Sequence, residues 1–325
     1  MRKVIPGLLI SVLFVYLSVR GTDFHSVIGD MAQIGYVFIL PFLLLMTLMQ
    51  ALRAWRWGMI LNPLEKLAPL TVFAITSVGF LAITALPARL GELLRPYLIA
   101  RHSSIKISAA LGTVFLERFC DGVTILTIAS LTPFFTQLPP WLIKANFIFL
   151  LVNLTLLAII ILAVFRRTLL EAFLNFCLRL CPRRWAAMLS RLLQHFLDGF
   201  QVIGDGPRLF QILLLSFLIW LIDALAIYIL FLAFKLPLPP VAAFVLMVIL
   251  MIGIAVPTAP GFIGNWHYSC VLGLSLFGIA KTEALTFAIL YHFLAVSFTA
   301  VMGLAFLPCL KFSWADLRQA IGRRL

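Results

Sequence analysis

Charge is what this chain has least of. Only 11% of its 325 residues are Asp, Glu, Lys or Arg, whereas 63% are hydrophobic and the mean hydropathy is +1.11. No stretch is long and polar enough to form a separate soluble domain, which argues against a soluble globular protein. Several apolar runs reach the roughly 17–25 residues that a bilayer span needs. The chain is therefore predicted to be an all-α integral membrane protein with a single polytopic domain over residues 1–325.

The residue patterns of metal sites and disulfides are also missing. The five cysteines are scattered, without a CxxC pair, and no histidines accompany them at the spacing of metal ligands. These absences argue against a zinc site and against a disulfide framework. We therefore expect no metal and no cofactor.

Acidic residues are scarce, with 12 Asp and Glu against 25 Lys and Arg. The basic residues cluster in short loops between apolar runs, which indicates membrane topology and contact with anionic headgroups rather than nucleic-acid binding. Arg2 and Lys3 precede the first apolar run, and no small-residue cleavage site follows before Arg20, so an uncleaved first span is expected. These features predict a multi-pass protein of the cytoplasmic (inner) membrane with both termini cytoplasmic.

The apolar runs predict about six full spans and two re-entrant or broken helical hairpins, with a possible inverted repeat. A short polar loop carrying Asp23 and Asp30 separates the first two spans, and Arg53 and Arg56 fall in the loop after the second. The arginine-rich segment 166–208 is predicted to be an amphipathic segment on the cytoplasmic surface. The full spans are expected at about residues 4–19, 35–52, 108–131, 145–165, 210–234 and 284–307.

The first break follows the apolar run that ends at Leu86. Pro87 has no amide hydrogen and should stop or kink the helix, and Gly91 allows a sharp turn or a close approach. A complete crossing here would place the next four basic residues outside, so we predict a hairpin that enters over 71–86 and returns over 90–99.

Candidate substrate-binding residues lie in this break and in the span after it. Charged groups at membrane depth persist only against protein or a watery cavity, so these side chains should face the protein interior. Two other interpretations stay open: Arg89 and Arg95 as ordinary cytoplasmic anchors, and the acids of the span as members of structural ion pairs. The candidates are Arg89, Glu92, Arg95, Glu117, Arg118 and Asp121.

A second break has four helix-interrupting residues, Pro257, Pro260, Gly261 and Gly264. Like the first break, it has an apolar approach, a proline and a glycine four residues later. Two interrupted segments in corresponding places are a sequence pointer to the midplane site of a transporter, so the prolines and glycines of both breaks are candidate gate or hinge residues. His267, just beyond the turn, and Asp223, a lone acid in an apolar run, are candidate titrating groups.

Three ordered motifs carry a resemblance to a known family. Arg89-Leu90-Gly91-Glu92 with Arg95, then Glu117-Arg118 with Asp121, then Pro260-Gly261-Phe262-Ile263-Gly264 resemble the flippase-like family named for the transmembrane region of lysylphosphatidylglycerol synthases. The likeness covers nearly the whole chain. It implies re-entrant hairpins and movement of a lipid headgroup between leaflets, with associated lipids ranging over aminoacylated phospholipids, hopanoids and polyisoprenyl-linked sugars.

Two departures from the family pattern affect what is expected. The aminoacyl-transferase domain of the two-domain members is absent, so lipid aminoacylation is not expected from this chain. Many members carry a glutamate after the late glycine turn, where this sequence has Asn265-Trp266-His267. His267 could replace that acid, or could simply be a hydrogen-bonded histidine at a helix start.

The resulting hypothesis is a lipid flippase that uses arginine to bind the phosphate of an anionic or polyisoprenyl-linked lipid. Membrane lipids are the expected partners, and nucleic acid is not one. Two rival functions stay open. One is a membrane-embedded transferase acting on a lipid-linked substrate, and the other is a scaffold for a lipid- or glycan-modifying enzyme that docks on residues 166–208.

Overall fold

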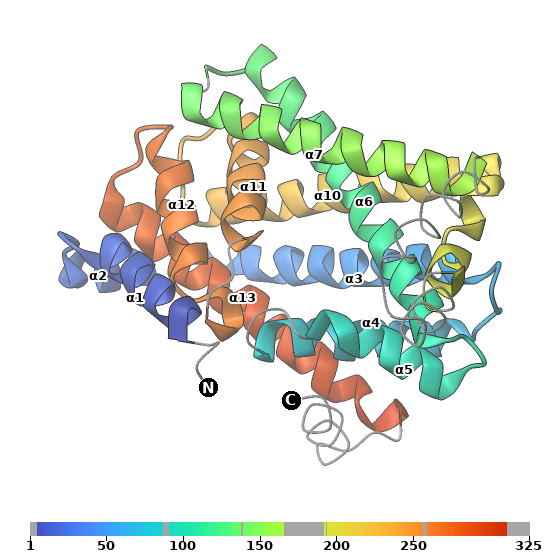
Figure 1. Cartoon of the computed structure of the whole chain (residues 1–325). Helices are drawn as coiled ribbons and strands as arrows, with labels where there is room; N and C mark the ends of the chain where they lie inside the picture. The colour runs from blue at the N-terminus through green and yellow to red at the C-terminus, as the bar shows by residue number, and fades with distance from the viewer. Residues whose placement is uncertain are drawn as a thin grey trace.

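The computed structural model describes residues 5–86, 91–137, 139–165, 192, 194–255 and 259–310, and these ranges contain helices and no strands. Figure 1 shows the helices stacked in a bundle with three-residue and four-residue 3₁₀ turns between some of them. The helices are α1 (Ile5–Val19), α2 (Phe24–Ala32), α3 (Ile39–Leu61), α4 (Pro69–Ala85), α5 (Leu94–His102), α6 (Ile107–Leu131), α7 (Pro140–Phe165), α10 (Gly206–Ala233), α11 (Pro240–Ala255), α12 (Asn265–Ser275) and α13 (Lys281–Phe306).

Within the described residues, three segments are long and apolar enough to cross a membrane: Tyr36–Leu61, Gly206–Ala233 and Lys281–Leu310. Helices α6 and α7 have 25 and 26 residues and so also reach spanning length. This architecture confirms the prediction of an all-α membrane protein. The predicted total of about six crossings stays a prediction, because length and composition together identify three spans among the described residues.

The centre of the bundle is built on α3 and α10, which pack along each other through the middle of Figure 1. Two apolar clusters surround them. The first joins α3, α10, α11 and α13 and includes Phe42, Phe231 and Phe287, all fully buried. The second joins the end of α3 to α4, α5 and α6 and includes Trp57 and Leu98. Helix α3 passes from one cluster to the other, and its arginines lie at the junction.

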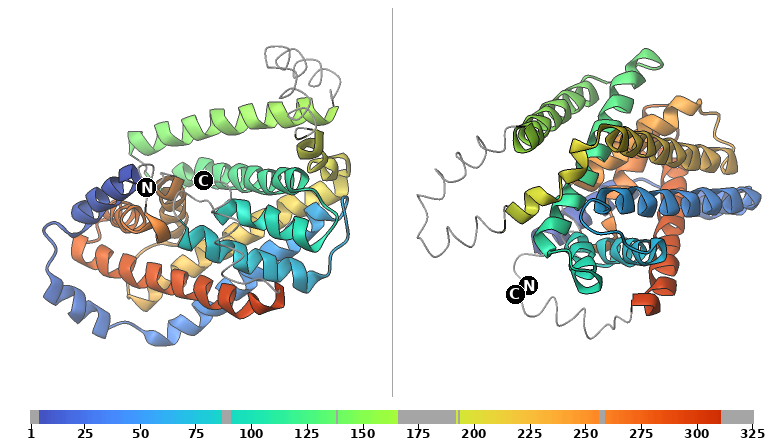
Figure 2. Two further views of the ribbon diagram at one scale, coloured as in Figure 1. Left: turned by 60° about the horizontal axis from the view of Figure 1, so that its bottom comes forward. Right: turned by 90° about the vertical axis from the view of Figure 1, so that its right-hand side faces the viewer.

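Both predicted hairpins are present as pairs of packed helices, α4 with α5 and α11 with α12. Helices from the first part of the chain pack on helices from the second part: α4 packs on α13, α6 packs on α11, and α3 packs on α10. The inverted repeat stays a prediction. Helix α7 lies along one side of the bundle, as Figure 2 shows.

Two elements differ from the sequence-based expectation. The polar stretch after the first span is helix α2, because the side chain of Asp23 caps it by accepting the His25 N–H at 3.0 Å. Helix α3 runs on to Leu61, so Arg53 and Arg56 lie inside a helix rather than in an interfacial loop. A prediction from hydropathy ends the span at the first arginine. The helix continues because these polar side chains have partners within the protein.

The loop between α3 and α4 is tied to the end of the first hairpin. The hydroxyl and the backbone N–H of Ser104 donate to Oε2 of Glu65 at 2.6 and 2.9 Å. Both hydrogen bonds lower the pKa of Glu65 from its ordinary value, and the one from the hydroxyl has the larger effect. The loop before α4 and the loop after α5 are thereby linked on the surface.

Candidate functional site

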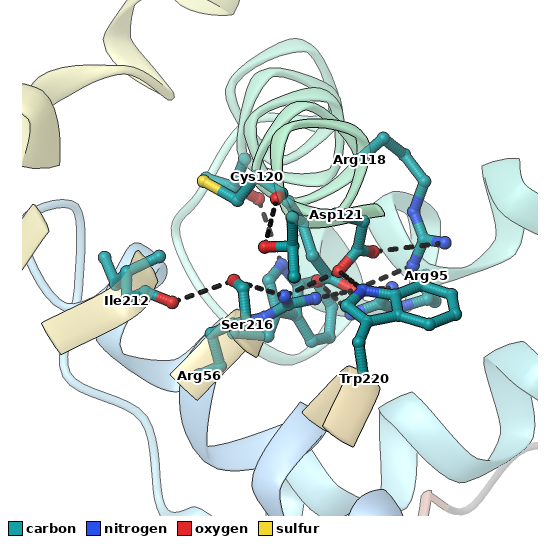
Figure 3. A network of polar contacts seen from close by, with 12 residues as sticks. Arg56, Arg95, Arg118, Cys120, Asp121, Ile212, Ser216 and Trp220 are labelled. Carbon is teal, nitrogen blue, oxygen red and sulfur yellow. Dashed lines mark hydrogen bonds and ion pairs between the residues drawn. The ribbon is translucent and has the colours of Figure 1, made fainter. Parts of the chain in front are cut away.

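An ion network is buried where α3, α5 and α6 meet (Figure 3). Arg56 on α3 and Arg95 on α5 are each 1% exposed, and Glu117 on α6 is fully buried. Asp121, one turn further along α6, is 6% exposed. Charges at such depth persist only when each is paired, so the contacts within the network decide what it can do.

Arg95 and Glu117 form the most specific contact of the network. Nη1 and Nη2 of Arg95 donate to Oε1 and Oε2 of Glu117 at 3.1 and 2.8 Å, a two-pronged arrangement that fixes both side chains. The guanidinium of Arg95 also lies 4.0 Å above the centre of the Trp57 ring. The first hairpin is therefore bound to α6 by an ion pair and to α3 by a cation–π contact.

Arg56 connects both acids. Its Nη1 donates to Oδ1 of Asp121 at 2.6 Å, and its Nη2 lies 3.4 Å from Oε1 of Glu117. Helix α10 supplies the remaining partners: Ser216 accepts from Arg56 at 2.6 Å, and Nε1 of Trp220 donates to Asp121 at 3.1 Å. The network thus joins four helices.

Arg118 is the network's exposed member, with 39% of its side chain accessible. It lies 2.9 Å from Glu117 and 3.5 Å from Asp121, three residues further along α6. Three guanidinium groups contact two carboxylates in the network, and Glu92 lies close enough to Arg118 for electrostatic attraction. Arg118 lies on the accessible edge of the network, where an anion can approach.

The structure brings together four of the predicted site residues, Arg95, Glu117, Arg118 and Asp121. The carboxylate partner of Arg95 is Glu117, on α6. Among the remaining candidates, Arg89, Pro87 and Pro257 lie outside the described residues.

Arg56 is the network residue that sequence analysis missed. A usable signal was present, because Gln50, Arg53 and Arg56 recur every three residues and so share one face of a helix. A polar face of that kind on an otherwise apolar helix indicates partners inside the protein rather than the start of a loop.

Gly91 lies directly against α4. A Cβ atom at this position would overlap the backbone of Ala82 and Ile83, so only glycine permits the two chains to pack this closely. Gly79, on α4, is similarly covered by the side chain of Arg95. The predicted importance of Gly91 therefore rests on close packing, and the hinge role stays a proposal.

The second hairpin has its own polar contacts. Gly261 and Gly264 have φ values of 72° and 96°, a region in which side chains are strained, so both glycines shape the turn after Pro260. His292 of α13 bonds the carbonyl of Gly261 through Nε2 at 2.6 Å, and its ring lies 4.7 Å from that of His267. His267 is thus at the helix start, as expected, beside a second histidine.

Asp223 is buried on α10, 9% exposed, and is close enough to Arg53 for electrostatic attraction. No group of three or more His, Cys, Asp or Glu side chains that could hold a metal ion occurs within the described ranges.

Comparison with known proteins gives two matches. The family described as the lysylphosphatidylglycerol synthase TM region matches residues 4–303, which confirms the resemblance found in the motifs. The chain is also 26% identical over 223 residues to a UPF0104 membrane protein of Methanocaldococcus jannaschii, covering 66% of this chain and 90% of that relative. No solved structure matches the chain.

Proposed function

Because this chain belongs to the lysylphosphatidylglycerol synthase transmembrane-region family, we propose that it moves the headgroup of an anionic phospholipid or polyisoprenyl-linked lipid between membrane leaflets. It is a multi-pass membrane protein, and we place it in the cytoplasmic membrane with both termini cytoplasmic. The proposal makes it a transporter rather than an enzyme, with membrane lipids as its partners.

The observation that carries this proposal is the accessible guanidinium of Arg118 at the edge of the buried network. Ionisable groups inside a membrane protein are expensive and usually mark a path for substrate or ions. Here the guanidinium of Arg118 is accessible, while those of Arg56 and Arg95 are enclosed. A phosphate is the natural complement, because guanidinium groups bind it through paired charge-assisted hydrogen bonds.

The network residues divide into two roles in this proposal. Arg118, with Arg89 and Glu92 in the first hairpin, contacts the headgroup. Arg95 and Glu117, already engaged with each other, position the hairpin and keep the interior polar. The interrupted hairpins act as gates, because a broken helix can change its packing without unfolding the remaining spans.

The rival scaffold function makes a different prediction. If residues 166–208 were a docking surface for a lipid- or glycan-modifying enzyme, deleting them should impair function more than changing Arg89. Turnover of a lipid substrate by the purified protein would favour the transferase instead.

Proteoliposomes containing a panel of labelled lipids test the proposal. We expect one anionic lipid class to cross between leaflets faster than in protein-free vesicles, and the same vesicles with Arg89→Ala to behave like protein-free ones. Equal incorporation of both proteins is the control. A folded Arg89→Ala protein with full activity would remove Arg89 from the site.

A further inference from the structure

A small pocket lies beside the ion network, between α3, α4 and α13, with a volume of about 30 Å³. Its floor is buried and includes Met49, Gln50 and Ser77. Its rim is half-buried and includes Arg53 and Phe298. At the roughly 10–15 Å³ that one water needs, the pocket admits about two water-sized groups, such as the oxygens of an oxyanion, but not a whole lipid headgroup.

Arg53 differs from the other arginines in this region. Arg56, Arg95 and Arg118 all contact carboxylates, whereas no carboxylate lies within ion-pair distance of Arg53 in the part of the chain that the structure describes. Its guanidinium instead lies 5.1 Å from the Phe80 ring centre and 6.0 Å from a ring of Trp220. Asp223 and Asp121 attract Arg53 from beyond ion-pair distance, so no carboxylate of the described residues covers its guanidinium, and an entering anion can contact it directly.

A hydroxyl on the pocket floor points to the same ligand chemistry. Nε2 of Gln50 donates to Oγ of Ser77 at 3.0 Å on the pocket floor. Among the described residues no acceptor takes the hydroxyl hydrogen of Ser77, so that donor remains for a ligand. A guanidinium with a nearby hydroxyl suits an oxygen-rich anion of the phosphate type.

The position of the pocket favours a lipid as the source of that anion. Arg53 is eight residues before Leu61, the end of α3, which corresponds to about 12 Å at 1.5 Å per residue and so lies well inside the span. The rim includes Phe298 and Thr299 of α13, and only 11% of the apolar window of that span is buried inside the protein. The pocket therefore borders a helix whose surface is largely left to the bilayer.

We propose that this pocket is a lateral phosphate subsite, in which Arg53 and Ser77 hold the phosphate of a lipid while its chains stay in the bilayer along α13. The subsite rests on the proposed function, because it would receive the lipid beside the ion network. Phe80 connects the two places, since Arg53 and Arg95 lie 5.1 and 5.6 Å from its ring centre.

Native mass spectrometry of the detergent-solubilised protein tests the subsite. The probes are phosphatidylglycerol, diacylglycerol with the same chains, and inorganic phosphate. Arg53→Gln removes the charge, Thr299→Phe fills the rim and leaves Arg53 in place, and Arg20→Gln is the matched control because Arg20 is exposed at the far end of α1. We expect both pocket variants to bind phosphatidylglycerol about 10–100-fold more weakly, the effect of losing a hydrogen bond to a charged group. Wild type and Arg20→Gln should retain phosphatidylglycerol and not diacylglycerol.

Three results would overturn the subsite: unchanged phosphatidylglycerol binding by both folded pocket variants, equal binding of diacylglycerol, or displacement of the lipid by inorganic phosphate at equal concentration. The last result would identify free phosphate as the ligand. Leaflet exchange is measured separately in proteoliposomes. Lipid exchange together with unchanged binding by the variants would contradict the subsite alone, and binding that depends on Arg53 without lipid exchange would contradict the proposed function alone.

Discussion

Glu117→Gln should lower the free energy of unfolding by about 3–5 kcal/mol, the usual consequence of removing one partner from a buried ion pair. The substitution keeps the shape of the side chain but leaves the enclosed guanidinium groups of Arg56 and Arg95 short of a counter-charge. A denaturant titration that monitors unfolding of the purified protein in mild detergent measures this change in free energy.

Two further variants separate charge from other effects. Glu283→Gln removes an acid that is half-buried at the start of α13, and surface changes of this kind usually stay within about 0.5 kcal/mol. The double variant Arg95→Met/Glu117→Leu removes both charges of one pair and should recover most of the lost stability. A Glu117→Gln protein as stable as Glu283→Gln would show that the carboxylate does not hold the network together.

Gly91→Ala should also destabilise the fold, by about 3 kcal/mol or more, because the added methyl group cannot be accommodated by moving a side chain. It would overlap the main chain of α4 at Ala82 and Ile83, so the first hairpin would have to separate from α4. The same measurement of unfolding applies, with loss of monodisperse protein as the more severe form of the result.

Gly29→Ala is the matched control for this change. Gly29 lies inside α2 and a Cβ there meets nothing within 4 Å, so alanine should be neutral or should stabilise by up to about 1 kcal/mol. If Gly91→Ala behaved like Gly29→Ala, the close packing of hairpin and α4 would be contradicted.

Much of the fold could be predicted because helix ends in this chain have local causes. The predicted span 108–131 matches α6, Ile107–Leu131, to within one residue at its start. It could be predicted because a basic residue precedes a long apolar run. Pro87 and the glycines after Pro260 likewise marked the interrupted hairpins. Membrane orientation, the type of membrane and the role of residues 166–208 stay predictions.

The ion network could be predicted only in part, because pairing over long sequence distances leaves no local pattern. Glu117, Arg118 and Asp121 stand out together in one apolar run, so their helix face was predictable. The contact of Arg56 with Asp121 joins residues 65 positions apart, and that of Arg56 with Ser216 joins residues 160 positions apart. Hydropathy read Arg56 as the start of a loop because its counter-charges belong to another helix.

The central claim is that the accessible guanidinium of Arg118 receives an anionic lipid, and leaflet exchange by Arg118→Gln tests it most directly. This variant leaves the contacts of Arg95 with Glu117 and of Arg56 with Asp121 in place. Arg118→Lys, which keeps the charge, and Arg20→Gln, which removes an exposed charge elsewhere, are measured beside it. The account predicts a folded Arg118→Gln protein that moves lipid about 10–100-fold more slowly than wild type, with partial recovery in Arg118→Lys. Wild-type exchange by Arg118→Gln would contradict it.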